Sequence, residues 1–329
     1  MEKITLSTPE LQAEVWTLGA AVNDVRVADR DGKVASVILG YDTEEQRLQG
    51  ISFLGEIVGP VANRIGEGGY DIDGVHYSPR LNDRDHAVLH GGDDGFHRQE
   101  WTILEQTETL VRLGLDWEAS DGSFPGPIHV QVEYEAFGSD LSHRITATAD
   151  QPTNLNIVSH PYFNLSGTLV SVCEHTLEVP AARYLPIDAH CIPFPDAPYD
   201  VEGSDFDLRV GREFCDLRFG SDPQIIAQHG LDHAYILEPG GFAGRLIHPP
   251  TGRVLNILSD YPALQVYTGQ GLGHAGVTHP VGKEESYVGV ALETEEYPDA
   301  PRRPDFPSIL VRPGETYRRA TTWRFSTQP

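Results

Sequence analysis

The chain of 329 residues is long enough to bury a large core, either as two ordinary domains or as one large β domain. It holds 24 lysine and arginine residues against 49 aspartate and glutamate residues, which gives a formal net charge of −25. Because nucleic acids and anionic membranes are bound by basic surfaces, this balance argues against both partners and mildly against a strongly anionic substrate.

Cysteine usage and the length of apolar runs set the expected compartment. Cys173, Cys191 and Cys215 are an odd number of cysteines without a CxxC spacing. That pattern predicts reduced thiols rather than a disulfide framework or a zinc ribbon. The chain starts with charged residues and has no run near the roughly 18 apolar residues of a membrane span. We therefore predict a cytoplasmic protein that does not enter membranes.

Apolar and polar residues alternate along much of the chain, which is typical of half-buried strands. The alternation is clear over residues 111–117, 130–136 and 141–149. Asp-Gly pairs favour tight turns because glycine accepts positive φ, and they predict hairpins over residues 26–39 and 70–77.

Helix signals are few. Residues 43–48 predict one short helix, capped by Asp42 or Thr43. A βαβ rhythm, an internal repeat and a low-complexity linker are all absent from the sequence. We therefore predict a single all-β domain over residues 1–329, built as a sandwich of large antiparallel sheets.

Glu293 directly follows an apolar run at residues 288–292, which predicts a core strand that ends in an acid. Proline then recurs at every third position from 298 to 307, and a second strand is expected over residues 308–311. A carboxylate pinned by a stiff loop suits a catalytic base. The alternatives are an ordinary surface acid and, for the prolines, a polyproline II ligand segment.

Asn63 and Arg64 lie between an apolar run and a glycine-rich turn in the stretch 58–66. An arginine held in this way can donate several hydrogen bonds in a fixed fork to sugar or carbonyl oxygens. The alternative is that Arg64 forms a structural salt bridge.

His90 is followed by two glycines, which let a ligand approach closely. The spacing of His86 and His90 would suit a metal pair on a helix. The glycines and the Asp-Asp-Gly that follow argue against a helix, and no third ligand has a matching spacing, so we expect no metal. The alternative for His90 is a hydrogen-bonded loop histidine.

His160 lies in the aromatic-rich stretch 156–167, where an imidazole can titrate near neutrality and act as an acid or can simply be a core histidine. Asp232, in the stretch 230–237, can accept hydrogen bonds from sugar hydroxyls or can merely begin a strand. The motifs of serine hydrolases, NTPases and dinucleotide enzymes are absent.

Taken in order, these stretches resemble the aldose 1-epimerase family, the galactose mutarotases. The resemblance covers nearly the whole chain and ends in its most specific block. The matching segments are ANRI at 62–65, LHGG at 89–92, HPYFNLSG at 160–167, LDH at 231–233, VYTG at 266–269, LET at 292–294, YPDAP at 297–301 and RPGETY at 312–317.

The resemblance implies a β-sandwich of the galactose mutarotase-like type, an open sugar-binding groove, and interconversion of the α and β anomers of a neutral hexose without a cofactor. It implies that Glu293 is the general base and His160 the general acid. The substrate-binding set that it implies is Arg64, His90 and Asp232, with Asn63, His97 and Gln270 as weaker members.

Mutarotation explains these residue types. A proton leaves the C1 hydroxyl while another reaches the ring oxygen, the ring opens to an aldehyde, and it recloses on the other face. No metal is needed, because Arg64 and His90 can donate to the small developing charge. We expect His160 to be protonated and Glu293 ionised in the resting enzyme, which predicts a bell-shaped pH profile.

This chain departs from the family at Ser159, at Pro60-Val61 and at Glu295, where the family often has glutamine. If the strand continues to residue 295, Glu293 and Glu295 face the same way and the second carboxylate raises the pKa of the first. Alternative functions are a hexose-6-phosphate mutarotase of the same fold, with Arg84, Arg98, Arg302 or Arg303 holding the phosphate, and a non-enzymatic sugar-binding protein. The expected partner is a small-molecule sugar, and the chain is expected to be a monomer or a homodimer.

Overall fold

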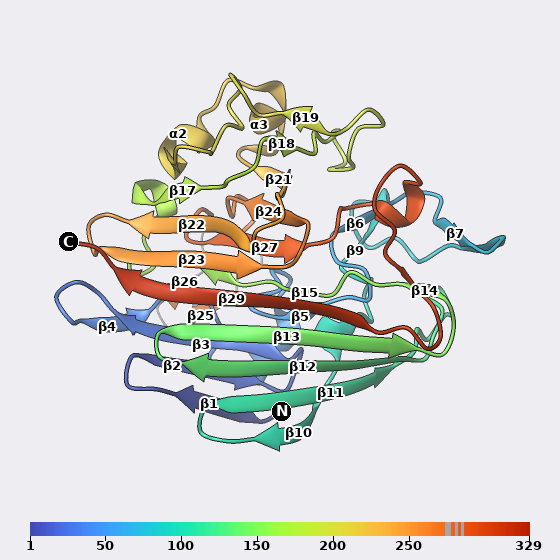
Figure 1. Cartoon of the computed structure of the whole chain (residues 1–329), viewed down its shortest axis with the longest axis horizontal. Helices are drawn as coiled ribbons and strands as arrows, with labels where there is room; N and C mark the ends of the chain where they lie inside the picture. The colour runs from blue at the N-terminus through green and yellow to red at the C-terminus, as the bar shows by residue number, and fades with distance from the viewer. Residues whose placement is uncertain (274–277, 280–281, 284–285) are drawn as a thin grey trace.

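A nine-stranded antiparallel sheet forms the broad face toward the viewer in Figure 1, in a computed structural model that describes residues 1–273, 278–279, 282–283 and 286–329. In spatial order the strands are β10 (Thr102–Gln106), β11 (Leu110–Trp117), β12 (Ile128–Phe137), β13 (Asp140–Ala149), β29 (Tyr317–Thr327), β23 (Arg253–Ser259), β22 (Phe242–His248), β17 (Thr176–Glu178) and β20 (Arg212–Glu213). Buried and more exposed residues alternate along β12 and β13, as the sequence pattern predicts.

Two further sheets complete the layers. The six-stranded sheet has the order β16 (Tyr162–Phe163), β27 (Val290–Glu295), β24 (Ala263–Tyr267), β21 (Asp232–Ile236), β18 (Arg183–Tyr184) and β19 (Tyr199–Asp200). The four-stranded sheet runs from β1 (Lys3–Ser7) through β2 (Leu11–Trp16) and β3 (Ala21–Ala28) to β4 (Val34–Ser36). It lies behind the lower strands of the large sheet in Figure 1, where β1 and β2 contact β11 and β12.

Five short strand pairs among the described residues form separate two-stranded sheets. They are β5 (Ile57–Val58) with β15 (Val158–Ser159), β6 (Arg64–Gly66) with β9 (Ala87–Leu89), β7 (Tyr70–Ile72) with β8 (Val75–Tyr77), β14 (Thr153–Asn154) with β28 (Leu310–Val311), and β25 (Thr278–His279) with β26 (Gly282–Lys283). The helical segments are equally short: α1 (Glu44–Gln49), α2 (Phe214–Arg218), α3 (Pro223–Gln228), η1 (Phe96–Arg98), η2 (Val172–Glu174) and η3 (Ala300–Arg302).

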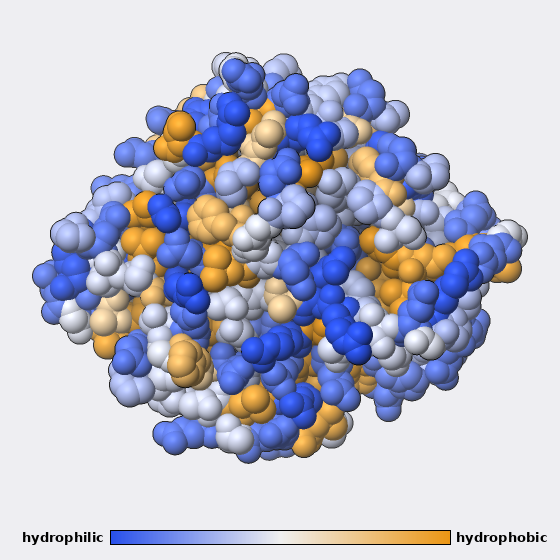
Figure 2. Space-filling view, in the orientation of Figure 1, coloured by the Kyte–Doolittle hydropathy of each residue, from blue (hydrophilic) through white to orange (hydrophobic). Residues whose placement is uncertain are grey.

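The hydrophobic core is shared between the layers. Its largest cluster of buried apolar side chains extends from Ile4 to Phe325 and includes Trp101, Phe163 and Trp323. One core drawn from both ends of the chain supports our proposal that residues 1–329 form a single domain. On the outside, hydrophilic residues cover most of the face seen in Figure 2, and apolar residues appear there in separate areas.

Several sequence predictions are confirmed by these elements. The hairpins at the two Asp-Gly turns are present as β3–β4 and β7–β8. The short helix forms at α1, where Thr43 makes a capping box with Gln46. Among the described residues, none of the helices is long and apolar enough to cross a membrane.

The strand that carries Glu293 differs from its prediction. It begins at Val290 rather than at residue 288 and continues past the acid to Glu295. All six residues of β27 are buried, because this strand lies between β16 and β24 inside the sheet. In the proline loop that follows, η3 forms a single 3₁₀ turn, so the polyproline II alternative is wrong for that segment.

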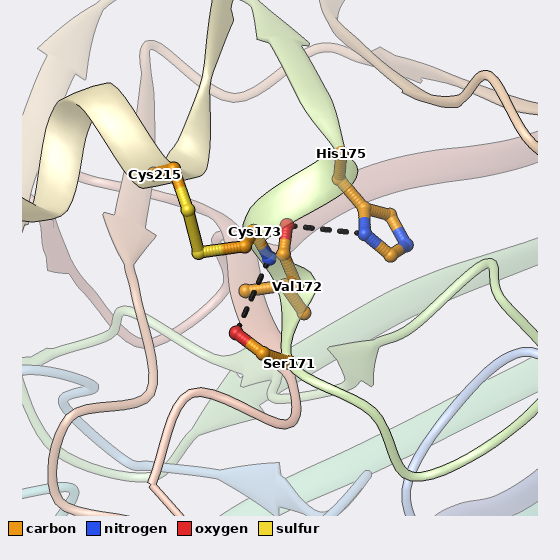
Figure 3. Close-up of a disulfide and its surroundings, with 5 residues drawn as sticks. All are labelled: Ser171, Val172, Cys173, His175 and Cys215. Carbon is orange, nitrogen blue, oxygen red and sulfur yellow. Dashed lines mark hydrogen bonds between the residues drawn. A yellow bond between two sulfur atoms is a disulfide. The ribbon is translucent and has the colours of Figure 1, made fainter.

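The prediction of reduced thiols is also wrong. Cys173 and Cys215 form a disulfide that joins η2 to α2 (Figure 3), and Cys191 is the free cysteine, in a buried position. The fold brings the two Cα atoms to 4.5 Å, although 42 positions separate them in sequence. That approach is within the range for a disulfide, and cysteine spacing alone cannot reveal it. Since disulfides persist mainly in oxidising compartments, cysteine usage no longer supports the expected cytoplasmic location.

We predict that this disulfide contributes substantially to stability. Closing a loop of 42 residues removes chain entropy from the unfolded state, worth about 4 kcal/mol in the loop-closure model. Unfolding by urea should therefore show a clear loss of stability for Cys173→Ser/Cys215→Ser. Cys191→Ser under the same conditions is the control, and equal midpoints for the double variant and the parent protein would contradict the prediction.

Candidate active site

Seven predicted site residues line one cleft of about 190 Å³. They are Asn63, Arg64, His90, His160, Asp232, Gln270 and Glu293. The six-stranded sheet supplies much of the wall, because β27, β24 and β21 are neighbours in it. The antiparallel pair β6–β9 supplies Arg64 at the start of one strand and His90 directly after the other.

Glu293 and His160 meet in this cleft. The Nε2 atom of His160 lies 3.3 Å from Oε2 of Glu293, and the two side chains are 5% and 4% exposed. The backbone of His160 is fixed by hydrogen bonds in both directions: its N–H donates to Glu56, and its carbonyl accepts from Gly55. Within the described part of the chain, Oε2 of Glu293 has no hydrogen-bond partner, although Nε2 of His160 lies 3.3 Å away. This oxygen can therefore still accept a hydrogen bond from a ligand hydroxyl.

Burial shifts both groups toward their neutral forms. It lowers the pKa of His160 to about 4. The pKa of Glu293 is raised well above its ordinary value, first by burial and then by Glu295 and Asp232, with Arg64 acting in the opposite direction. The expectation of a protonated His160 beside an ionised Glu293 is therefore wrong for the resting site, because neither charge is hydrated there. The expected effect of Glu295 on Glu293 is confirmed.

Arg64 is held between two carboxylates. Its Nε donates to Asp83 at 2.7 Å, and its Nη1 lies 3.6 Å from Asp232. Burial alone would lower the pKa of Arg64, but Asp232 and Asp83 raise it above the ordinary value, so the guanidinium stays charged. Gln265, which lies opposite Glu293 on β24, donates to the other oxygen of Asp232 at 2.6 Å. Arg64 thus forms the salt bridges that the structural alternative predicted, and it also lines the cleft.

Asn63 and His90 both have left-handed backbones, with φ values of 60° and 54°. The N–H of His90 donates to the carbonyl of Asn63, and the N–H of Asn63 donates to Nδ1 of His90. Because Nδ1 accepts a hydrogen bond, neutral His90 carries its proton on Nε2. The pKa of His90 is lowered well below its usual value, mainly by burial, so this imidazole is a neutral donor.

The donor chemistry of this cluster does not favour a metal ion. His90, His160 and Glu293 each offer one candidate ligand atom within 4.8 Å of the others. A neutral His90 with its proton on Nε2 would have to give up its hydrogen bond from Asn63 to offer Nε2 as a ligand. His86, the other histidine of the rejected metal pair, instead lies against the ring of His190 at 3.8 Å.

Gln270 and His97, two of the weaker members of the predicted set, lie in different surroundings. Gln270 lines the cleft, and its amide is held by Leu231 and Thr268. His97 is buried, and its ring lies 5.0 Å from that of Phe53 between centroids. It is not among the described residues that line the cleft. Burial lowers its pKa to about 3, so the imidazole of His97 is neutral.

Sequence reasoning missed Phe53 and Asp83. Phe53 lines the cleft, and its ring lies 4.6 Å from that of His90 and 5.8 Å from that of His160. Asp83 orients Arg64. Both lie in loops without hydrophobic periodicity, so the only available signals were an apolar residue near Gly55 and an acid in a charged stretch.

Solved structures place this architecture among known folds. An aldose epimerase homologue from C. elegans superposes with a TM-score of 0.92 at 26% identity, over 100% of this chain and 99% of that one. A galactose 1-epimerase from Lactobacillus acidophilus superposes with a TM-score of 0.86 at 27% identity, over 99% and 95%. The fold is thus the galactose mutarotase-like β fold.

Sequence comparison defines the family. The family model described as aldose 1-epimerase matches residues 2–324. The galactose mutarotase of Rattus norvegicus is 35% identical over 99% of this chain and 94% of its own length. The aldose 1-epimerase of Escherichia coli strain K12 is 33% identical over 93% and 90%. The chain belongs to the aldose 1-epimerase family, a family of isomerases.

The raised pKa of Glu293 predicts a pH-dependent cost to stability. An unfolded glutamate loses its proton near 4.5, whereas folded Glu293 keeps it to higher pH. The proton therefore stabilises the folded state most at low pH, and this contribution falls as pH rises through the raised pKa. Glu293→Gln should thus be more stable than the parent protein at pH 8, and the difference should shrink toward pH 5.

Urea unfolding at the two pH values measures this difference. Glu108→Gln, which changes an exposed glutamate, is the control and should show no such trend. A Glu293→Gln variant that is less stable than the parent protein at pH 8 would show that the ionised carboxylate stabilises the fold.

Proposed function

We propose that this aldose 1-epimerase interconverts the anomers of a neutral hexose, with Glu293 as general base and His160 as general acid. The observation that carries the proposal is the buried contact of 3.3 Å between these two groups, in a cleft lined by five further members of the predicted set. General acid–base groups must reach the protons that they move, and here both open onto one small cavity.

The pair carries out the reaction with one proton. In the resting site this proton is on Glu293, and passing it across the contact to His160 gives a carboxylate and an imidazolium with no change in net charge. The carboxylate then takes the proton of the C1 hydroxyl, and Nε2 of His160 protonates the ring oxygen as the C1–O5 bond breaks. Rotation about C1–C2 and the reverse transfers give the other anomer and restore the pair.

The remaining side chains bind the sugar away from the reacting bond. Asp232 accepts hydroxyl protons, while Arg64 and neutral His90 donate to oxygens. Asn63 fixes His90, and Gln270 closes one side of the cleft. Because these groups are already held by neighbours such as Asp83 and Gln265, little reordering is needed when a sugar binds.

Polarimetry on freshly dissolved α-glucose and α-galactose tests the proposal. Glu293→Gln and His160→Asn should each lower kcat by about 10² to 10⁴, the usual contribution of one proton-transfer group. Glu108→Gln is the matched control. Full activity in Glu293→Gln would remove the carboxylate from the mechanism, and no activity in the parent protein would favour the sugar-binding alternative.

The pH profile gives an independent test. The pair is active with one proton, so activity falls when it gains a second proton or loses its last one. With the pKa of His160 lowered to about 4 and that of Glu293 raised, the profile of kcat/KM should be a bell with its acid limb near pH 4. A rate that is constant from pH 4 to pH 10 would contradict this assignment.

A neutral sugar fits the cleft better than a sugar phosphate. Arg98 donates to three backbone carbonyls, and Arg302 and Arg303 are paired with Asp299 and Asp305. Of the four arginines considered for phosphate binding, Arg84 lines the cleft, with 66% of its side chain exposed.

Glucose 6-phosphate should therefore be a poorer substrate than glucose. We expect kcat/KM to be at least about tenfold lower, since one unfavourable charge contact of about 1.4 kcal/mol has that effect. Coupled polarimetric assays on the two sugars measure the ratio, and Arg84→Ala tests whether any residual activity depends on that guanidinium. A preference for the phosphate would overturn the choice of substrate.

A cytoplasmic location and a monomeric or homodimeric state stay predictions of the sequence.

A further inference from the structure

Glu295 is a buried acid that the reaction does not use directly. It follows Glu293 by two positions on β27, so both side chains point to the same face of the strand. Glu293 lines the cleft, whereas Glu295 is fully buried and is not among the described residues that line it. A carboxyl without solvent is costly to ionise, so its position needs a physical explanation.

Glu295 contacts the cleft through Asn63. The side-chain amide of Asn63 donates to Oε1 of Glu295 at 3.1 Å. The side-chain oxygen of Asn63 accepts a hydrogen bond from the backbone N–H of Arg64 at 2.9 Å. The backbone N–H of Asn63 donates to Nδ1 of His90. Asn63 therefore uses both ends of its side-chain amide and its left-handed backbone to hold two cleft residues, and Glu295 is the anchor for its amide.

Glu295 also acts on Glu293 by charge. The charged and titratable groups that face Glu293 are His160, Asp232, Arg64 and Glu295. After burial, Glu295 is the largest influence that raises the pKa of Glu293. Burial also raises the pKa of Glu295 well above its ordinary value, Asp232 and Glu296 act in the same direction, and the hydrogen bond from the amide of Asn63 opposes them. The ionised form of Glu295, which this hydrogen bond favours, is the form that acts on Glu293.

We propose that Glu295 is a positioning residue of the active site, which anchors Asn63 beneath Arg64 and His90 and whose negative charge keeps the working proton on the Glu293–His160 pair. This assignment rests on the proposed roles of Glu293 and His160. It makes Glu295 the residue that sets the alkaline limit of the reaction, without any contact with the sugar.

Glu295→Gln tests the role of the charge. The glutamine keeps an oxygen that can accept from Asn63 and removes the negative charge. The alkaline limb of the kcat/KM profile should move to lower pH by about one unit, so that activity on this limb drops about tenfold relative to the parent protein. The acid limb near pH 4 should stay in place, because the raised pKa of Glu295 leaves its carboxyl protonated there. An alkaline limb that stays in place in a folded Glu295→Gln variant overturns the proposal.

Glu296→Gln is the matched control. Glu296 is the next residue, directly after the end of β27, is also buried, and pairs with Arg319 at 2.5 Å. The same chemical change one position away should leave the alkaline limb where it is. An equal shift in both variants would show a general effect of lost charge and would also overturn the specific role of Glu295.

A measurement on the parent protein keeps the proposal testable if Glu295→Gln does not fold or if the parent protein is inactive. Carbon-13 NMR of labelled glutamate side chains follows the two carboxyls directly, with Glu293→Gln used for assignment. The proposal requires Glu295 to lose its proton before Glu293. A Glu295 carboxyl that keeps its proton throughout the titration of Glu293 overturns it, whereas failure of the polarimetric assay alone overturns only the proposed function.

Discussion

The contact between Glu293 and His160 is the constraint on which the rest of the structure depends. Two ionisable groups lie 3.3 Å apart with almost no exposure, so neither charge is stabilised by water. Such a contact must be enforced by the surrounding fold. A fully buried central strand holds Glu293 from one side. On the other side, backbone hydrogen bonds join His160 to the loop at Gly55 and Glu56, and the buried ion pair of Glu56 with Arg47 at 2.9 Å keeps that loop in place.

A second cost is backbone strain at the cleft. Phe53, Asn63 and His90 all have positive φ, which non-glycine residues adopt at a cost of about 1–3 kcal/mol when the surroundings impose it. The strain at Asn63 and His90 has an identifiable use: the N–H of Asn63 donates to Nδ1 of His90, and the N–H of His90 donates to the carbonyl of Asn63. The first of these bonds fixes the proton of His90 on Nε2. The ring of Phe53 lies beside the rings of His90 and His160.

The sequence predicted those features whose signals lie in short continuous segments. The seven site residues that share the cleft each belong to a motif, and strands such as β12 carry a period of two, so both could be read before the fold was known. Features that depend on the meeting of distant segments could not be read. The disulfide of Cys173 with Cys215, the pairing of Asp83 with Arg64, and the position of Phe53 are of this kind. The protonation of His160 was predicted wrongly for the same reason, since desolvation is a property of the packed site.

The charge arrangement of the cleft connects the acidic composition to the chemistry. The guanidinium of Arg64 is flanked by Asp83 and Asp232, while Glu293 and Glu295 lie on β27. With carboxylates in excess, the cleft attracts protons and hydroxyl donors and disfavours anions. Burial lowers the pKa of His160 and is the largest cause that raises the pKa of Glu293, which Glu295 and Asp232 raise further. In the mechanism that we propose, these influences together keep the working proton on the Glu293–His160 pair, and the ring opening of a neutral sugar needs no net charge to enter or leave.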